Sequence, residues 1–162
     1  MRLLLSLFLC STLSLFSQAF SLRLVVEKGT PGAIEMKWKT DEEEEAVYVS
    51  KEEIISDKHI EEAHPDLARR GAMYFRVNER GGVLLRQTIE NADGEKTRVA
   101  AIINGHLDFV GKWGGQNDKQ FLLTGLKTEM NSLMKLGRTL SAKGRPKPVE
   151  QGVAAEPDRA GG

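Results

Sequence analysis

Three histidines, His59, His64 and His106, are the side chains best suited to acid–base or metal chemistry near neutral pH. His59 and His64 are five residues apart, whereas paired zinc-binding histidines on one helix face are about four residues apart. His106 follows a predicted hairpin turn. We therefore expect all three to be surface histidines, and the sequence predicts no metal-binding residue.

Motifs for nucleophiles and phosphate binding add no candidate. The sequence has neither the G-x-S-x-G pattern of a nucleophilic serine nor the G-x-x-x-x-G-K-[ST] pattern of a phosphate-binding loop. Asp108 and Glu129 have no evident partner that would tune them for acid–base work. The sequence therefore predicts no catalytic residue and no cofactor. The alternative is an exported enzyme whose site combines carboxylates with His106.

The two tryptophans differ in their surroundings. Trp38 follows a strict alternation of apolar and charged residues, which predicts a core position. Trp113 lies in a polar, glycine-rich segment, residues 111–118, where an aromatic ring either caps the edge of a sheet or anchors a partner. We interpret Trp113, Lys112 and Gln116 as a candidate partner-binding loop.

The first nineteen residues have the order of a secretory signal peptide. Arg2 supplies the positive charge, residues 3–16 form an apolar stretch, and Ser17-Gln18-Ala19 places small residues where a signal peptidase reads them. The predicted cut lies between Ala19 and Phe20. Cleavage would deliver the protein to the periplasm or outside the cell, without an integral membrane span.

Three alternatives to a cleaved signal peptide exist for this leader. A buried or membrane-spanning helix is disfavoured because the apolar run is shorter than the roughly 20 residues that a bilayer needs. A lipoprotein signal at Cys10 is disfavoured because Phe8 and Leu9 are bulky. An uncleaved signal would tether the protein to a membrane. Cleavage would remove Cys10, the only cysteine, and would thereby exclude thiol chemistry.

Charge limits the class of partner. The formal net charge is zero, so no overall electrostatic field favours nucleic acid or an anionic membrane surface. The acidic run at residues 41–45 is typical of a solvated loop. We therefore expect no nucleic-acid partner.

Alternation of apolar and polar residues predicts most of the strands, and a continuous apolar run predicts a buried one. Gly29–Gly32 is a turn that joins two strands, and Asn104-Gly105 joins two more, because a type I′ turn needs positive φ at both positions. The predicted strands are residues 22–26, 34–38, 46–49, 73–77, 99–103, 107–109 and 120–123.

Capping residues and helical spacing predict three helices. In the first, Ile60 and Ala63 would share one face. The expected starts and stops are Ser56 and Pro65, Asn78 and Gly94, and Thr124 and Gly137. Beyond them the composition turns to Lys, Arg, Pro, Gly and Ala, which predicts disorder.

These elements predict an α+β fold: a mixed, mostly antiparallel sheet with helices packed on one face, ferredoxin-like in style. The expected organisation is a signal peptide at residues 1–19, one domain at 20–137 and a disordered tail at 138–162.

The motifs between Tyr48 and Gly137 resemble the head subdomain of the first periplasmic domain of the protein-export membrane protein SecD. Residues 49–56 are similar to the family's lysine-rich strand end and short helix, and residues 75–88 to its strand and glycine-started helix. Residues 100–105 (AAIING) resemble its A-I-V-L-D-G hairpin. Residues 123–133 are similar to its I-S-G-x-F and E-A-x-x-L helix entry.

Some positions depart from the family pattern. Asn104 replaces the family aspartate, and Asp108-Phe109-Val110 stand where the family has S-A-P. The family's transmembrane helices have no counterpart in these residues, so proton-driven translocation is not carried over. The resemblance implies the fold, an envelope location and contact with exported polypeptide.

We therefore expect a non-enzymatic envelope domain that binds a polypeptide or an envelope protein, through a sheet edge or the Trp113 loop. Besides an enzyme, the alternative is a structural subunit of an envelope complex that is tethered by the tail from Arg138.

Overall fold

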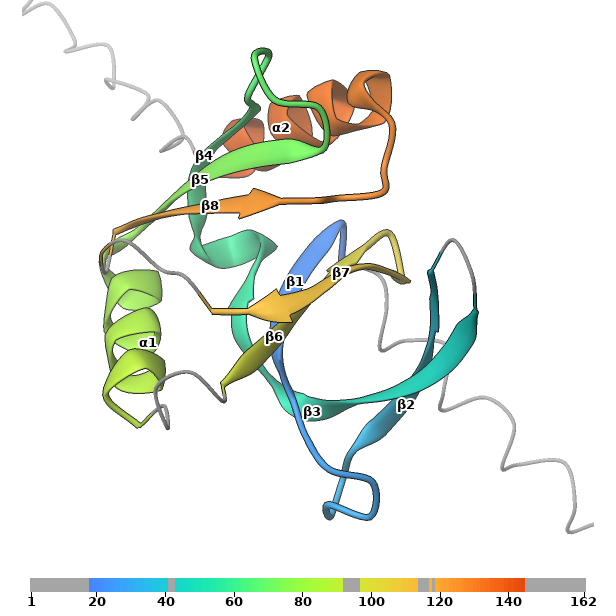
Figure 1. Cartoon of the computed structure of the whole chain (residues 1–162). Coiled ribbons are helices and arrows are strands. Elements are labelled where there is room, and N and C mark those ends of the chain that lie inside the picture. Colours follow the sequence, from blue (N-terminus) through green and yellow to red (C-terminus); the bar gives the residue numbers. More distant parts are fainter. Residues whose placement is uncertain (1–17, 41–42, 92–96, 114–116, 118, 145–162) are drawn as a thin grey trace, which may run out of the picture.

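The computed structural model describes residues 18–40, 43–91, 97–113, 117 and 119–144 (Figure 1). In chain order, the elements are β1 (Phe20–Val25), β2 (Ile34–Lys39), β3 (Glu44–Ser56), the short 3-10 helix η2 (Asp57–His59), β4 (Ile60–Pro65), β5 (Ala72–Val77), α1 (Glu79–Glu90), β6 (Arg98–Ile103), β7 (His106–Lys112), β8 (Gln120–Thr124) and α2 (Met130–Gly144). The predicted leader through residue 17, the tail from residue 145, Gly94 and Gln116 lie outside the described residues.

The strands form two sheets. One has the order β2-β3-β1-β6-β7 and the other the order β4-β5-β8, and their pairings are antiparallel. Helix α1 packs against β3 and β5, and α2 packs against β4. The α+β class is confirmed. The single sheet with helices on one face is wrong, because η2 turns the chain out of the first sheet and β4 starts a second one.

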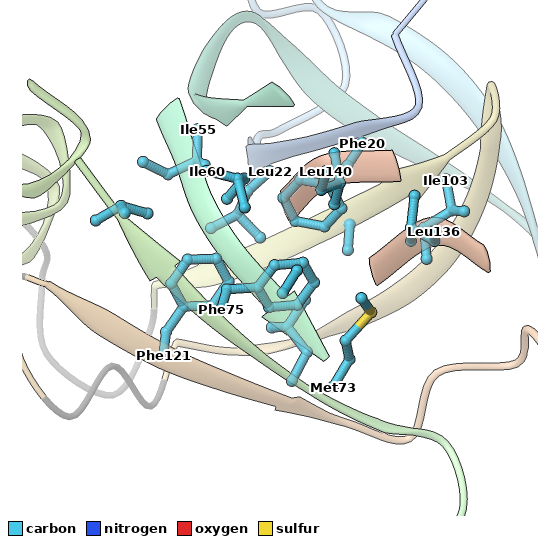
Figure 2. Close-up of a cluster of buried hydrophobic side chains, with 14 of the residues drawn as sticks. Phe20, Leu22, Ile55, Ile60, Met73, Phe75, Ile103, Phe121, Leu136 and Leu140 are labelled. Atoms are coloured by element: carbon cyan, nitrogen blue, oxygen red, sulfur yellow. The ribbon is translucent and has the colours of Figure 1, made fainter. Parts of the chain in front are cut away.

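The main core lies between the two sheets. Rings from three strands stack in a row, with centroid distances of 4.6 Å from Phe20 to Phe75 and 4.8 Å from Phe75 to Phe121 (Figure 2). Helix α2 adds Leu133 and Leu140 to this core, and both are fully buried. Each such side chain contributes about 1.5–3 kcal/mol by leaving water.

A second, smaller cluster lies on the other face of the five-stranded sheet, which curls so that β2 approaches β7. Val49 and Ile102 are buried in it. Trp38 packs against its rim half-buried, so its predicted core position is only partly met. The ammonium of Lys127 lies 3.7 Å from the centroid of this indole, within the range of a cation–π contact.

Two local predictions are confirmed. Asn104 and Gly105 have φ angles of 49° and 82° at the tight turn between β6 and β7, which is the positive-φ pair that a type I′ hairpin needs. The side chain of Asn78 accepts a hydrogen bond of 2.9 Å from the amide of Gly81 and so caps the start of α1.

The predicted helix after Ser56 is wrong. Only residues 57–59 form a single 3-10 turn, and the chain then continues as β4, paired with β5. Ile60 and Ala63 are both buried although a regular strand would turn them to opposite faces. A register shift between Ile60 and Glu62 explains this spacing of three, since a bulge inserts one extra residue.

The last helix is displaced from its prediction. Thr124 ends β8 and does not cap a helix, and α2 runs from Met130 to Gly144. Gly137 therefore lies inside the helix and does not end it. It fits there because the helix lies so close to β4 that a Cβ at this position would be 2.6 Å from the carbonyl oxygen of Ala63. The predicted start of the disordered tail at Arg138 is wrong, since Leu140 continues the buried stripe.

Candidate functional site

The predicted partner-binding loop is only partly described. Trp113 is half-buried and packs its ring against Phe121 at a centroid distance of 5.7 Å. Its backbone amide donates to the carbonyl of Thr97 at 3.1 Å. Lys112 is exposed at the end of β7. The indole thus closes one end of the core, and its role as a partner anchor stays a prediction.

The histidines divide into two classes. His64 and His106 are exposed, as predicted. His59 is buried, which corrects the prediction, because the 3-10 turn folds its ring back onto the chain. The Nδ1 atom of His59 accepts a hydrogen bond of 3.1 Å from the amide of Ser56. Burial, followed by the charges of Lys58 and Arg80, lowers the pKa of His59.

The structure also corrects the prediction that Asp108 has no partner. It is the extra residue of a bulge in β7, since Phe109 pairs with Ala101 and Leu107 pairs with Ile102. Its carboxylate is buried and accepts a hydrogen bond of 2.7 Å from the hydroxyl of Thr128. Burial raises the pKa of Asp108, and the hydrogen bonds from Thr128 and Lys127 oppose that shift.

Metal-ligand clusters and membrane-spanning helices are both missing from the described part of the chain. There, no group of three or more His, Cys, Asp or Glu side chains lies close enough together to hold a metal ion. None of the helices in the same residues is both long and apolar enough to cross a bilayer.

The edges of the sheets are the remaining candidate, because an edge strand presents unpaired backbone groups to a partner. Two edges of the five-stranded sheet are protected. β2 carries exposed Lys37 and Lys39, and β7 carries the bulge at Asp108. Charges and bulges both discourage the pairing of another strand.

The β4 edge is covered by helix α2. The hydroxyl of Ser141 accepts from the amide of Ala63 at 3.0 Å and donates to its carbonyl at 3.2 Å. Gly137 and Gly144 let the helix approach the backbone of β4, and Pro65 has no amide hydrogen to offer. This edge is closed to another strand.

β8 has none of these protections along its described residues. Its sequence, Gln-Phe-Leu-Leu-Thr, contains no charge and no proline, and its register with β5 is regular. Figure 1 shows β5 between β8 and β4. We define the β8 edge by Leu122 and Thr124, whose backbone groups face away from β5.

The direction of these groups follows from the hydrogen bonds of the sheet. The backbone amide and carbonyl of Ala63 bond the hydroxyl of Ser141, so they form no hydrogen bonds with the paired residue Phe75. The amide and carbonyl of Phe75 therefore point toward β8. The amide of Val77 accordingly donates to Lys119 at 2.9 Å. Phe121, the partner of Phe75, therefore directs its backbone groups toward β5. Because the backbone groups of alternate residues point to opposite sides of a strand, those of Leu122 point away from β5. No described residue bonds its amide.

A row of side chains on the outer face of the three-stranded sheet continues to this edge. His64, Tyr74 and Leu122 are direct cross-strand partners, and the rings of His64 and Tyr74 stack at 5.2 Å. These three residues line a groove of about 420 Å³ together with Leu67, which is 78% exposed. Apolar side chains on a solvated face are typical of a contact surface.

A larger groove of about 840 Å³ adjoins this row between β4 and α2. Leu67 and Met134 supply apolar lining, and Arg138 supplies a positive charge. The other arginine, Arg76, is 3.0 Å from the carboxylate of Glu62. His106 lines neither groove, so the structure does not bring it to this surface.

Sequence reasoning named a sheet edge as a binding surface but did not find which one. Leu67, Tyr74 and Leu122 were not singled out, because the partners of a strand are not visible in its own sequence. The signal that could have found them is the uncharged, proline-free pattern of residues 120–124.

Comparisons with known proteins bear on the fold. No protein-family model matches the chain, and a search of curated proteins gives no match. A solved structure of SecDF, described as its crystal structure in the super-membrane-facing form, is similar with a TM-score of 0.52 and 12% sequence identity. The match covers 80% of this chain and 20% of the SecDF chain. The fold is therefore SecD-like.

Proposed function

We propose that the protein is an exported, non-enzymatic envelope module that binds an extended polypeptide segment along the β8 edge. The observation that carries the proposal is that β8 lacks the charges, bulge and covering helix found at the other three sheet edges. A partner strand would bond the outward amides and carbonyls of Leu122 and Thr124. Strand addition of this kind supplies affinity through main-chain hydrogen bonds.

The row of His64, Tyr74 and Leu122 on the outer face of the three-stranded sheet indicates which polypeptide segments would bind beside β8. An added strand places alternate side chains on the outer face, beside Leu122 and Tyr74. We infer a preference for segments with alternating apolar residues, as found in unfolded or partly exported chains. The likeness to SecDF supports this proposal at the level of the fold alone. The head-subdomain identity and the periplasmic location belong to the proposal.

Leu122→Pro tests the backbone contact. Proline removes the outward amide hydrogen and is tolerated on edge strands whose amide faces away from the sheet. The probe is a fluorescent, permanently unfolded polypeptide, reduced and alkylated α-lactalbumin, titrated by fluorescence anisotropy. We expect saturable binding to the wild-type protein and a loss of at least about fivefold in affinity for Leu122→Pro, since one hydrogen bond contributes about 1 kcal/mol.

Leu122→Ala is the matched control, because it keeps the amide and removes only the side chain. It should weaken binding by a few-fold, less than the proline variant does. Thermal unfolding followed by circular dichroism verifies that both variants fold. Equal affinity for Leu122→Pro and the wild-type protein would refute binding along β8.

A further inference from the structure

The first strand begins at the residue that follows the predicted cleavage site. Phe20 opens β1 and is completely buried. Its ring stacks on Phe75 in the main core (Figure 2). Among the described residues, Phe20 is the first that is fully buried in the core.

The backbone nitrogen of Phe20 lies against a buried carboxylate. Asp57, from η2, is 8% exposed. Its Oδ1 atom accepts from the nitrogen of Phe20 at 2.7 Å, and its Oδ2 atom accepts from the nitrogen of Ala19 at 3.1 Å. Lys143, from α2, lies 2.6 Å from Oδ2, but its side chain is half-exposed. Within the described residues, a buried anion thus lies beside this nitrogen, and a partly solvated cation lies beside the anion.

We propose that the Ala19–Phe20 bond is hydrolysed during export and that Asp57 then binds the new α-ammonium of Phe20. An endopeptidase of the export pathway would add water across the bond. The water oxygen joins the Ala19 carbonyl carbon, which leaves as a carboxylate, and the Phe20 nitrogen takes up protons to become an ammonium. The 2.7 Å hydrogen bond then becomes a charge-assisted ion pair, which is stronger than its neutral counterpart.

Cleavage would remove the two backbone hydrogen bonds of Ala19, and both are replaceable. The carbonyl of Ala19 accepts from the amide of Asn104 at 3.1 Å, but Asn104 is exposed at the hairpin turn, so water can take over this bond. The bond from Ala19 to Asp57 is replaced by a second proton of the ammonium. Lys143 can turn into solvent as the new cation takes its place. Cleavage would therefore hold the first strand in the core through the ion pair between the α-ammonium of Phe20 and Asp57.

The position of the cut is the first test. The full chain is expressed in an exporting bacterial host, recovered from the envelope fraction and analysed by intact mass and N-terminal sequencing. The proposal predicts a chain that starts at Phe20. A retained leader, or a start at any other residue, overturns it. Binding along β8 does not depend on this result, because the β8 edge lies on the other sheet.

The state of the α-amine is the second test. Acylation of the α-amine of the recovered protein should be at least about tenfold slower in the native state than in urea, because an amine paired with a carboxylate keeps its proton. Asp57→Asn should restore the fast rate. Glu52→Gln, at an exposed carboxylate on β3, is the control and should leave the rate slow.

A third measurement covers the case in which Asp57→Asn does not fold. The acylation rate of the wild-type α-amine is followed against pH, and its midpoint should lie above the ordinary value of about 8 for an α-amine. A midpoint at or below that value, or labelling as fast as in urea, overturns the pairing with Asp57.

Discussion

Buried polar side chains lie where regular strand pairing is interrupted. The guanidinium of Arg23 donates to the carbonyls of Ser50 and Lys51 and lies 2.8 Å from the carboxylate of Glu53. The register of β1 against β3 shifts at this point, so Arg23 bonds the backbone groups that the irregular pairing releases. Asp108 occupies the bulge of β7 in a similar way.

The burial of His59 can be tested through the pH dependence of the free energy of unfolding. Its folded-state pKa is lowered, so the neutral ring is favoured in the folded state, and its contribution to stability is present above the unfolded pKa of about 6.5. That contribution is lost as the pH falls from about 6.5 through the lowered folded pKa. The free energy of unfolding, measured in urea from about pH 7.5 to about pH 5, should therefore fall with acid.

His59→Asn isolates this effect, because the amide oxygen can accept from Ser56 but does not titrate in this range. The variant should lose much of the acid-dependent decrease in stability. His64→Asn, at an exposed histidine, should retain this decrease. An unchanged pH profile in His59→Asn would show that another group titrates.

At the scale of elements, α2 depends on close contact with β4. Gly137→Ala should destabilise the protein by about 1–3 kcal/mol, because the added methyl meets the carbonyl of Ala63 at 2.6 Å. Helix propensity alone predicts the opposite sign, since alanine favours a helix over glycine by about 1 kcal/mol. The measurement is urea unfolding at neutral pH.

Ser132→Ala is the matched control, because Ser132 is exposed near the start of the same helix. It should be neutral or slightly stabilising. A stabilised Gly137→Ala variant would contradict the packing of α2 on β4.

How much of the fold the sequence predicts depends on how local each signal is. The Asn104-Gly105 turn and the Asn78 cap are set by neighbouring residues, and both were predicted correctly. The β4 strand was missed because its bulge imitates helical spacing at Ile60 and Ala63. Gly137 looked like a helix end because its close contact is with Ala63, far away in the sequence.

The same reason limits prediction of the candidate site. The Trp113 loop was predicted as a candidate because a lone aromatic residue in a glycine-rich segment is visible in the sequence. The packing of this ring on Phe121 is visible only in the fold. The β8 edge becomes visible only when the partners of all edge strands are known. Its row of His64, Tyr74 and Leu122 joins three separate segments.

In the whole molecule, two sheets share one core, but their edges differ in how they are protected against the pairing of another strand. β4 is closed by Ser141 of α2, and β7 is bulged at Asp108. β8 stays regular and uncharged at the far side of the smaller sheet. Among the described strands, this unequal protection supports the proposed addition of a partner strand, because an open edge at β8 fixes where the partner would bind.

Amide hydrogen exchange resolved by NMR tests this central claim most directly. With saturating unfolded polypeptide, the amides of Leu122 and Thr124 should become protected, while those of Phe121 and Leu123, which face β5, should change little. The neighbouring residues thus control for general stabilisation. Protection gained at β2 or around Trp113, with Leu122 unchanged, would contradict the account.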